Sequence, residues 1–308
     1  MNDTRMLGRL ARLHYENGLT HQEIAKLYDL SRVKVTRMLA EARQRGIVEI
    51  TVHTDERPFA EVEQRLLETY GLRGVLISPP GSADAGSLPG LDLAGAEALA
   101  RLLPRARRVA IGFSQAVSDS VNALGALSVE GLEVYPAAGG RAGRANGSNP
   151  QELVTRISQA TGGSAFHLPA PLVAASNEVH DALMDAVGGR EVLDQAAASD
   201  LMVVGIGSAD SLAPVLVQQV GADDLEKVRA TSAVGDISAR FFTTSGEPVA
   251  EGIDSRVVGL TIEQMRAIRV RLAIAGGAVK VPAIRAALSS GLINCLVTDL
   301  GCAEALLD

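Results

Sequence analysis

Apolar and polar positions follow two different periods along this chain. From about residue 74 onward, apolar runs of five to eight residues alternate with segments in which apolar residues recur every three to four positions. The short runs indicate buried strands and the longer period indicates amphipathic helices. Strands are predicted at 74–78, 108–113, 132–138, 164–169, 200–207, 257–261, 270–277 and 293–298, and helices at 91–103, 115–127, 150–161, 178–187, 190–197, 262–267, 280–289 and 301–307. This alternation favours a Rossmann-like α/β fold with a parallel sheet covered on both faces.

The first 46 residues show only the helical period. A first helix is predicted over 4–17, where Gly18 ends it. Thr20 followed by Glu23 forms a capping box, and Ser31 is a second N-cap, so two more helices are predicted over 20–28 and 31–46. The residues expected to face the core of these two helices are Ile24, Ala25, Leu27, Val33 or Val35, Met38, Leu39 and Ala42. Residues 46–52 then alternate as a strand does, which predicts a small β wing.

Charge divides the 308 residues unevenly. The whole chain has a net charge of −7, but residues 1–48 hold nine Lys/Arg against five Asp/Glu, which leaves the rest strongly acidic. A basic head on an acidic body indicates that the head meets a polyanion. Two short helices joined by a tight turn, the second of them basic, fit the helix-turn-helix motif, which places its second helix in the DNA major groove. Proteins that bind DNA in this way are usually dimers. The candidate DNA contacts are Gln22, Ser31, Arg32, Lys34, Val35, Thr36 and Arg37. The alternative is a solvated basic face on an ordinary three-helix unit.

The sequence therefore predicts two domains: a helix-turn-helix domain over 1–54 and an effector-binding and oligomerisation domain over 55–308. A connecting helix over 58–70 places Phe59, Val62, Leu66 and Tyr70 on one apolar stripe. This stripe either packs on its own domain or transmits motion, or forms a dimer contact, between head and body.

Glycine-rich loops follow several of the predicted strands. Ligands of open α/β sheets bind beyond the carboxyl ends of the strands. Backbone N–H groups at helix starts favour anions, whereas a cation there opposes the helix dipole. Lys280 is therefore unfavourable at this helix start, which suggests a phosphate or carboxylate ligand. Asp236 can accept hydrogen bonds from sugar hydroxyls. The candidate ligand residues are Gly112, Ser114, Gln115, Gly139, Gly140, Asp236, Gly276, Gly277 and Lys280. The alternatives are a solvated lysine beside a tight turn and an aspartate that caps a turn.

Other kinds of site find no support in the sequence. The stretches around Gly205 and Gly276 match neither the dinucleotide fingerprint nor the P-loop, so no cofactor is expected. The five histidines and two cysteines show no metal-ligand spacing, and no catalytic set can be argued from spacing. No apolar run is long enough to span a bilayer, and the first residues lack the apolar region of a signal peptide. We expect a cytoplasmic protein without a membrane partner.

With these residues in view, the chain resembles the SorC family of bacterial sugar-responsive transcription regulators. The resemblance covers essentially the whole chain. It rests on LARLHYENGLTHQEIAKLYDLSRVKVTRMLAEARQRGIVEI in the head and on FHLPAPLVA, ASDLMVVGIGS, AVGDISARFF, VVGLTIEQM, LAIAGGAVKVPAIRAAL and GLINCLVTD in the body. It implies a helix-turn-helix head and an effector domain similar to the glucosamine-6-phosphate deaminase and ribose-5-phosphate isomerase fold. Such regulators usually bind a phosphorylated sugar and act as dimers or tetramers on operators near carbohydrate genes.

The resemblance also implies roles for particular residues. Lys280 with Gly276 and Gly277 matches the family's phosphate-binding turn, and Asp236 matches its carboxylate near the sugar hydroxyls. The loop at Gly112, Ser114 and Gln115 departs from the family's usual G-W-G-R-T, because Ala116 replaces the threonine. The effector is therefore expected to be a sugar, a polyol or a sugar phosphate.

Three functions remain as hypotheses. The favoured one is a regulator of carbohydrate metabolism, without enzyme activity, whose affinity for a double-stranded DNA operator is set by the effector and which acts as a homodimer or homotetramer. The second is a sugar-phosphate isomerase or deaminase with an added head, against which the head and the missing acid/base pair argue. The third is a DNA-binding protein whose body only oligomerises.

Overall fold

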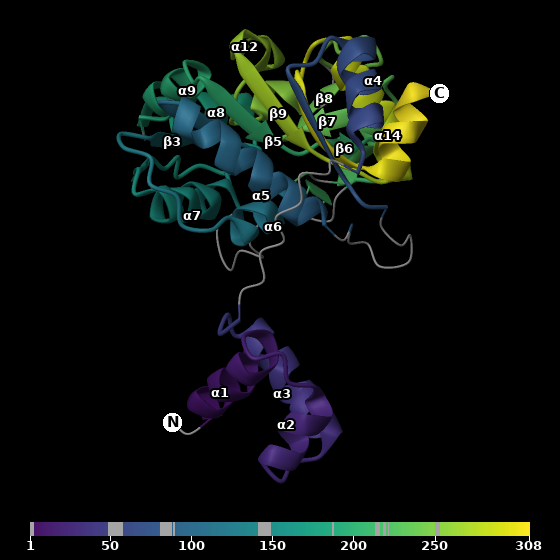
Figure 1. Ribbon diagram of the computed structural model, residues 1–308. Coiled ribbons are helices and arrows are strands. Elements are labelled where there is room, and N and C mark those ends of the chain that lie inside the picture. Colours follow the sequence, from purple (N-terminus) through teal and green to yellow (C-terminus); the bar gives the residue numbers. More distant parts are fainter. Residues whose placement is uncertain are drawn as a thin grey trace. The chain divides into compact units, whose positions relative to one another are not determined.

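The chain folds as two compact units, Met1–Pro58 and Phe59–Asp308. The computed structural model describes residues 3–48, 58–80, 88, 90–140, 149–186, 188–212, 216–217, 220, 222–249 and 253–308 (Figure 1). The boundary predicted between residues 54 and 55, and most of the predicted wing at 46–52, lie outside these residues.

The described residues of the first unit form three helices: α1 (Asp3–Tyr15), α2 (His21–Leu27) and α3 (Arg32–Gln44). The capping box is present, since the Thr20 side chain accepts a hydrogen bond from the Glu23 N–H and the Glu23 carboxylate accepts one from the Thr20 N–H. Ser31 caps α3 through the Lys34 N–H at 3.2 Å. The three helices share a small apolar core made by Leu7, Leu10, Ala11, Ile24, Ala25, Val35, Leu39 and Ala42.

Two predictions about that core need correction. Leu27 is 63% exposed, because α2 is only two turns long and Leu27 is its last residue, beyond the part that packs on the core. Of the two valines considered for the core face of α3, Val33 is 78% exposed and Val35 is completely buried. The core face of α3 therefore runs through Val35, Leu39 and Ala42, at the spacing of one helical face.

The second unit is built on a seven-stranded parallel sheet with the order β1-β10-β9-β5-β2-β3-β4. Its strands are β1 (Gly74–Ser78), β2 (Arg108–Ile111), β3 (Glu133–Pro136), β4 (Ser164–Ala165), β5 (Leu201–Val204), β9 (Val270–Ile274) and β10 (Cys295–Asp299). Alternate residues of each central strand enter separate apolar clusters: Val109 and Ile111 face one side of β2, and Ala110 faces the other. This alternation is what helices on both faces require.

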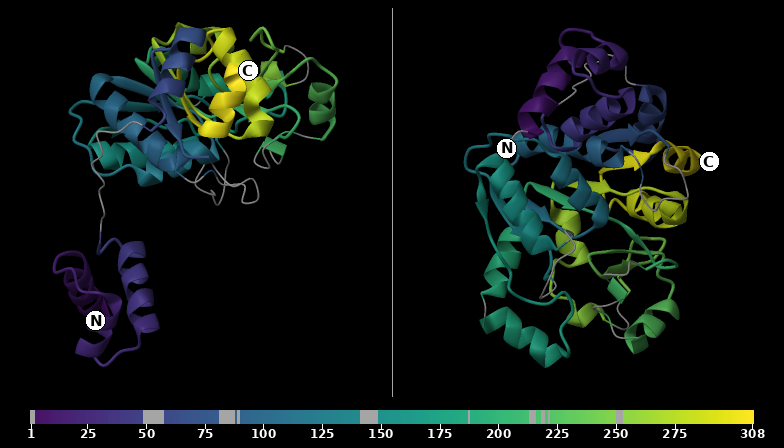
Figure 2. Two further views of the ribbon diagram at one scale, coloured as in Figure 1. Left: turned by 45° about the vertical axis from the view of Figure 1, so that its right-hand side comes forward. Right: turned by 90° about the horizontal axis from the view of Figure 1, so that it is seen from below.

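Helices cover both faces of the sheet (Figure 2). The cluster on one face includes residues of α5 (Leu91–Leu102), α6 (Gln115–Ala123) and α7 (Pro150–Thr161). The cluster on the other face includes residues of α4 (Ala60–Tyr70), α8 (Asn177–Ala186), α9 (Gly189–Ala197), α12 (Ile262–Ala267), α13 (Val281–Ser289) and α14 (Leu300–Leu307). Helix α11 (Ala222–Arg229) contributes instead to a third cluster.

The connecting helix α4 packs on its own unit, beside α14 (Figure 1). Leu66 is completely buried, and the Tyr70 hydroxyl donates to the Leu306 carbonyl at 2.7 Å. The buried Glu63 carboxylate accepts a hydrogen bond from the Ile77 N–H of β1 at 3.1 Å. The apolar stripe therefore serves intradomain packing, and a role for this helix between subunits stays a hypothesis.

A second, antiparallel sheet was not predicted. It consists of β6 (Gly207–Ser208), β7 (Gly235–Ile237) and β8 (Arg240–Phe242). The loop between β7 and β8 is Ser238-Ala239, and both residues have positive φ, 51° and 66°. Two-residue hairpin loops usually contain Asn-Gly or Asp-Gly, and this turn contains neither.

The strand predicted at 257–261 is absent. Val257 and Gly259 form only isolated bridges, with Val173 and Ala138. The reason is the buried Arg240, whose guanidinium donates to the carbonyls of Val257, Gly259 and Leu260 at 3.0–3.1 Å. Those carbonyls bond a side chain instead of a neighbouring strand.

Candidate functional site

The candidate ligand site lies at the carboxyl edge of the sheet, where β9, β5 and β2 are neighbours. The loops that begin at Gly276, Gly205 and Gly112 therefore meet at one place. The β6–β8 sheet joins them, because Gly207 of β6 pairs with Asp236 of β7. The structure thus brings together most of the ligand residues predicted from the sequence.

Asp236 is the most unusual residue of this site. Its side chain is buried, and its Oδ2 accepts a hydrogen bond from the Ala239 N–H at 3.1 Å. Burial raises the pKa of Asp236 to about 6, against which the Ala239 N–H and the positive charge of Lys280 act. A Cβ atom at Gly207 would lie 2.0 Å from Asp236 Oδ1, so only glycine fits opposite the carboxylate.

Lys280 lies near Asp236. Burial lowers the pKa of Lys280, and the Asp236 carboxylate acts in the opposite direction. Lys280 ends the 3₁₀ turn η4 (Ala278–Lys280), and α13 begins one residue later than predicted, at Val281. A buried carboxylate and a half-buried ammonium group at one edge can bind hydroxyl groups and an anionic group of the same ligand.

Asp299 organises the Gly276-Gly277 turn and was missed by the sequence analysis. Its Oδ2 accepts a hydrogen bond from the Gly277 N–H at 2.7 Å, and its Oδ1 accepts one from the Cys302 N–H at the start of α14. The Lys280 N–H bonds the Gly277 carbonyl. The N–H groups of Gly277 and Lys280, which the sequence suggested as donors to a bound anion, therefore already donate hydrogen bonds within the protein. An Asp at the end of a predicted strand was the available signal.

In the loop after β2, Gly112 is required for close packing against Ser238. A Cβ atom at Gly112 would lie 2.6 Å from Ser238 Oγ, and one at Gly205 would lie 2.2 Å from Ser114 Cβ. Ser114 caps α6 by accepting the Val117 N–H at 3.0 Å. Gln115 is exposed, and its amide donates to Asp119 at 2.8 Å. Ser238, which no sequence pattern indicated, has a buried hydroxyl without a hydrogen-bond partner among the described residues.

Gly139 and Gly140 lie after β3, the next strand beyond β2. The Gly139 N–H donates to the Val258 carbonyl at 2.8 Å and the Gly140 N–H donates to the Ala170 carbonyl at 2.9 Å. A Cβ atom at Gly139 would meet the Pro171 carbonyl at 2.2 Å. The structure gives these glycines a packing role, and their N–H groups are already bonded.

The predicted DNA contacts lie on the surface of α3 and at the start of α2, with one exception. Arg32, Lys34, Thr36 and Arg37 are exposed on α3, as are its N-cap Ser31 and Gln22 of α2. The correction concerns Val35, which is completely buried in the three-helix core and cannot reach a bound molecule.

The head also contains a histidine that the sequence analysis did not single out. His21 Nδ1 lies 3.0 Å from the Thr36 hydroxyl, and its ring packs edge-on to His14 with centroids 4.7 Å apart. Burial, His14 and the nearby Arg32 and Arg43 lower the pKa of His21. His21 thus ties α2 to the middle of α3.

Metal-binding clusters and membrane-spanning helices are both absent from the described residues. No group of three or more His, Cys, Asp or Glu side chains there could hold a metal ion. None of the helices in that part of the chain is both long and apolar enough to cross a membrane. Both cysteines are buried free thiols, and burial raises the pKa of each to about 11.

A three-helix unit followed in sequence by an α/β domain places the chain in the class of ligand-binding transcription regulators, as comparisons with known proteins show. Residues 57–308 match the family model of a sugar-binding domain. Over 308 residues the chain is 29% identical to the "Erythritol catabolism regulatory protein EryD" of Brucella abortus, which covers 99% of this chain and 97% of that protein. It is 31% identical to the "Transcriptional regulator LsrR" of Escherichia coli, covering 100% and 96%.

Among solved structures, the full-length sorbitol operon regulator SorC of Klebsiella pneumoniae shares the fold with a TM-score of 0.75, at 24% identity, over 100% of both chains. The protein belongs to the SorC family of sugar-binding transcriptional regulators.

Proposed function

We propose that this protein controls genes of carbohydrate metabolism by binding a DNA operator through α3 and a sugar or polyol effector through the carboxyl edge of its sheet. The observation that supports this most directly is the buried Asp236 beside Lys280, over glycines that admit no side chain. A buried carboxylate destabilises the folded protein unless hydrogen bonds from a ligand or a nearby positive charge compensate for its lost hydration. The relatives' names, which mention erythritol and sorbitol, favour a polyol or a related sugar.

We also propose the domain bounds, the assembly and the roles of individual residues. The head extends over residues 1–54 with a wing at 46–52, and the body over 55–308 has the isomerase-like arrangement that the resemblance implies. The protein acts in the cytoplasm as a homodimer or homotetramer, without enzyme activity. Gly112, Ser114, Gln115, Gly139 and Gly140 line or support the site, and the Gly276-Gly277 turn positions Lys280, whose ammonium group binds an anionic group of the ligand. The contacts to DNA come from Gln22, Ser31, Arg32, Lys34, Thr36 and Arg37.

Two single substitutions test the division of labour. Arg37→Ala is expected to weaken operator binding and leave effector binding intact, because Arg37 is exposed on α3. Lys280→Ala is expected to do the reverse. Arg9→Ala on α1 and Lys227→Ala on α11 are matched controls, since both side chains are exposed and remote in sequence from these positions.

Effector binding is measured by thermal shift against sugars, polyols and sugar phosphates. A ligand at about 100 times its Kd adds about 2.7 kcal/mol to the stability of the folded state, which is a clear rise in Tm. DNA binding is measured by fluorescence anisotropy with operator fragments at fixed salt. If Lys280→Ala changes neither affinity, the assignment of the ligand site is wrong.

A further inference from the structure

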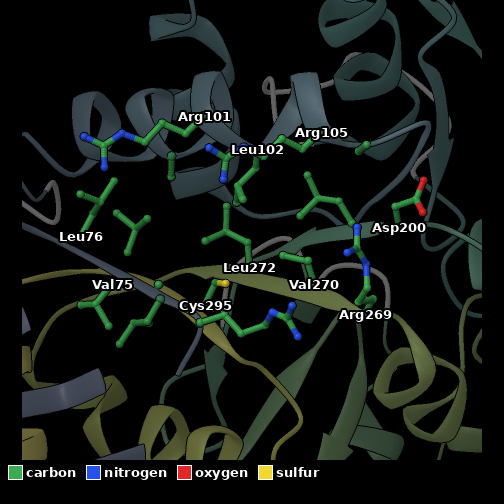
Figure 3. Close-up of a pocket in the computed structure, with 17 residues that line it drawn as sticks. Val75, Leu76, Arg101, Leu102, Arg105, Asp200, Arg269, Val270, Leu272 and Cys295 are labelled. Carbon is green, nitrogen blue, oxygen red and sulfur yellow. The ribbon is translucent and has the colours of Figure 1, made fainter. Parts of the chain in front are cut away.

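A cavity of about 600 Å³ lies at the opposite edge of the sheet from the proposed sugar site (Figure 3). It is lined by the first residues of β1, β9 and β10, by the start of β5, and by the end of α5 with the short turn that follows it, η2 (Leu103–Arg105). Strands of four or five residues are about 13–17 Å long, so the two edges are separate places in the protein. The sugar-binding role proposed above does not involve this cavity.

Arginine dominates the charge of this cavity. Four arginines line it, together with a single carboxylate, Asp200; the arginines are Arg73, Arg101, Arg105 and Arg269. Arg101 pairs with Glu97 along α5. The side chains of Arg73, Arg105 and Arg269 form no ion pair within the described part of the chain.

Asp200 offsets only part of this positive charge. Its Oδ2 accepts hydrogen bonds from the backbone N–H groups of Arg107 and Arg108, at 2.9 and 3.1 Å. Burial acts to raise the pKa of Asp200, but these hydrogen bonds and the charge of Arg269 outweigh it and lower the pKa. The carboxylate is thus ionised and already engaged, and the rim keeps a positive charge.

The floor of the cavity is apolar. Leu76, Leu102 and Val270 are only half-buried there, and Leu272 and Val297 lie deeper on the same face of the sheet. Figure 3 shows Arg105 and Arg269 on different walls, with Leu102, Leu272 and Val270 in the region between them. An apolar floor under a cationic rim is complementary to a molecule with one apolar part and one anionic part.

We propose that this cavity is a second ligand site, which binds a small amphipathic anion: an apolar ring or chain that carries a phosphate, sulfonate or carboxylate group. The guanidinium fork matches such oxyanions with paired hydrogen bonds. The competing interpretation is that the arginines only complement helix ends, since α4 and α5 both end near this edge and cations are favoured there. Helix ends alone give no reason for a volume of this size above half-buried leucines.

The test uses 8-anilinonaphthalene-1-sulfonate as the probe, titrated into the full-length protein and followed by fluorescence. We expect saturable binding that Arg105→Gln and Arg269→Gln each weaken at least about fivefold, because each removes a charge-assisted contact. Arg229→Gln is the matched control, since Arg229 is an exposed arginine at the end of α11. It should leave the affinity within about twofold.

Two more variants separate dye binding in this cavity from dye binding elsewhere on the protein. Ala98→Leu narrows the cavity from α5 and should weaken dye binding while the protein still melts cooperatively. Lys280→Ala alters the proposed sugar site and should leave dye binding unchanged. The proposal is overturned if the arginine variants bind the dye like the wild type, if Lys280→Ala weakens binding as much as they do, or if they change the oligomeric mass in sedimentation, which would make the cavity a subunit interface.

Discussion

Replacing Asp236 by Asn should stabilise the folded protein at neutral pH and abolish effector binding at the same time. Burial raises the pKa of Asp236 from 3.8 to about 6. One pKa unit corresponds to about 1.4 kcal/mol, so the ionised carboxylate destabilises the folded state by about 3 kcal/mol above pH 7. Asn keeps an oxygen that can accept the Ala239 N–H, but it cannot ionise.

The pH dependence follows from the direction of this shift. Between pH 3.8 and 6 the folded state binds more protons than the unfolded state, so the destabilisation by Asp236 grows as the pH rises through this range. It amounts to about 1 kcal/mol at pH 4.5 and about 3 kcal/mol at pH 7.5. The advantage of Asp236→Asn over the wild type should therefore increase by about 2 kcal/mol between these pH values. Any constant contribution from burying the amide cancels in this difference.

Urea unfolding of both proteins at pH 4.5 and 7.5 measures this difference. Asp210→Asn is the matched control, because Asp210 is exposed and close in sequence to β6. It should show no such change with pH. If the free-energy difference between Asp236→Asn and the wild type is the same at both pH values, the pKa of Asp236 is not raised in the folded protein. If the variant also binds the effector normally, Asp236 is only a turn-capping residue.

Three other predictions concern single residues. The stability of the head should fall as the pH drops below 6.5, because the pKa of His21 is lowered in the folded state and the unfolded chain takes up the proton more readily; hydrogen exchange of α2 and α3 measures this. Gly207→Ala should destabilise the body by about 1–3 kcal/mol, since its Cβ would lie 2.0 Å from Asp236 Oδ1, and urea unfolding measures the loss. Arg240→Met should lower stability by about 3–5 kcal/mol in the same assay, because buried carbonyls and Asp254 lose their cationic partner.

Each of these has its own contradicting result. His21→Gln should remove the acid sensitivity of the head, and an unchanged profile would assign it to another group. Gly125→Ala is the control for Gly207→Ala, since a Cβ there meets nothing within 4 Å; equal effects of the two would refute the packing argument. A loss below about 1 kcal/mol in Arg240→Met would mean that water replaces the guanidinium.

The parallel sheet could be predicted because each central strand is a short apolar run between helices. The strand 74–78 and the helix 262–267 coincide with β1 and α12, and both N-caps of the head are as predicted. The β6–β8 sheet could not be predicted, because its turn uses Ser238 and Ala239 at positive φ. Asp299 was missed for a similar reason: its role depends on the meeting of two loops that are 22 residues apart. Val35 was misplaced although the helical period could have assigned it, because Val35, Leu39 and Ala42 lie at i, i+4 and i+7 on one face and Val33 lies on the opposite face.

Backbone strain and buried polar groups are concentrated around Asp236, which indicates a ligand site. The non-glycine residues with positive φ among those described are Asp29, in the head, and Ser238 and Ala239, next to Asp236. The same small region holds a buried hydroxyl without a partner among the described residues, a carboxylate with a raised pKa and a lysine with a lowered pKa. Strain and buried charge persist only where the surrounding structure enforces them, and they gather at ligand sites. Here the surrounding structure includes Gly207, which packs against the Asp236 carboxylate, and Gly205, which packs against Ser114. A ligand that satisfies Ser238, Asp236 and Lys280 together should therefore raise stability by more than its contacts with any one of them could explain.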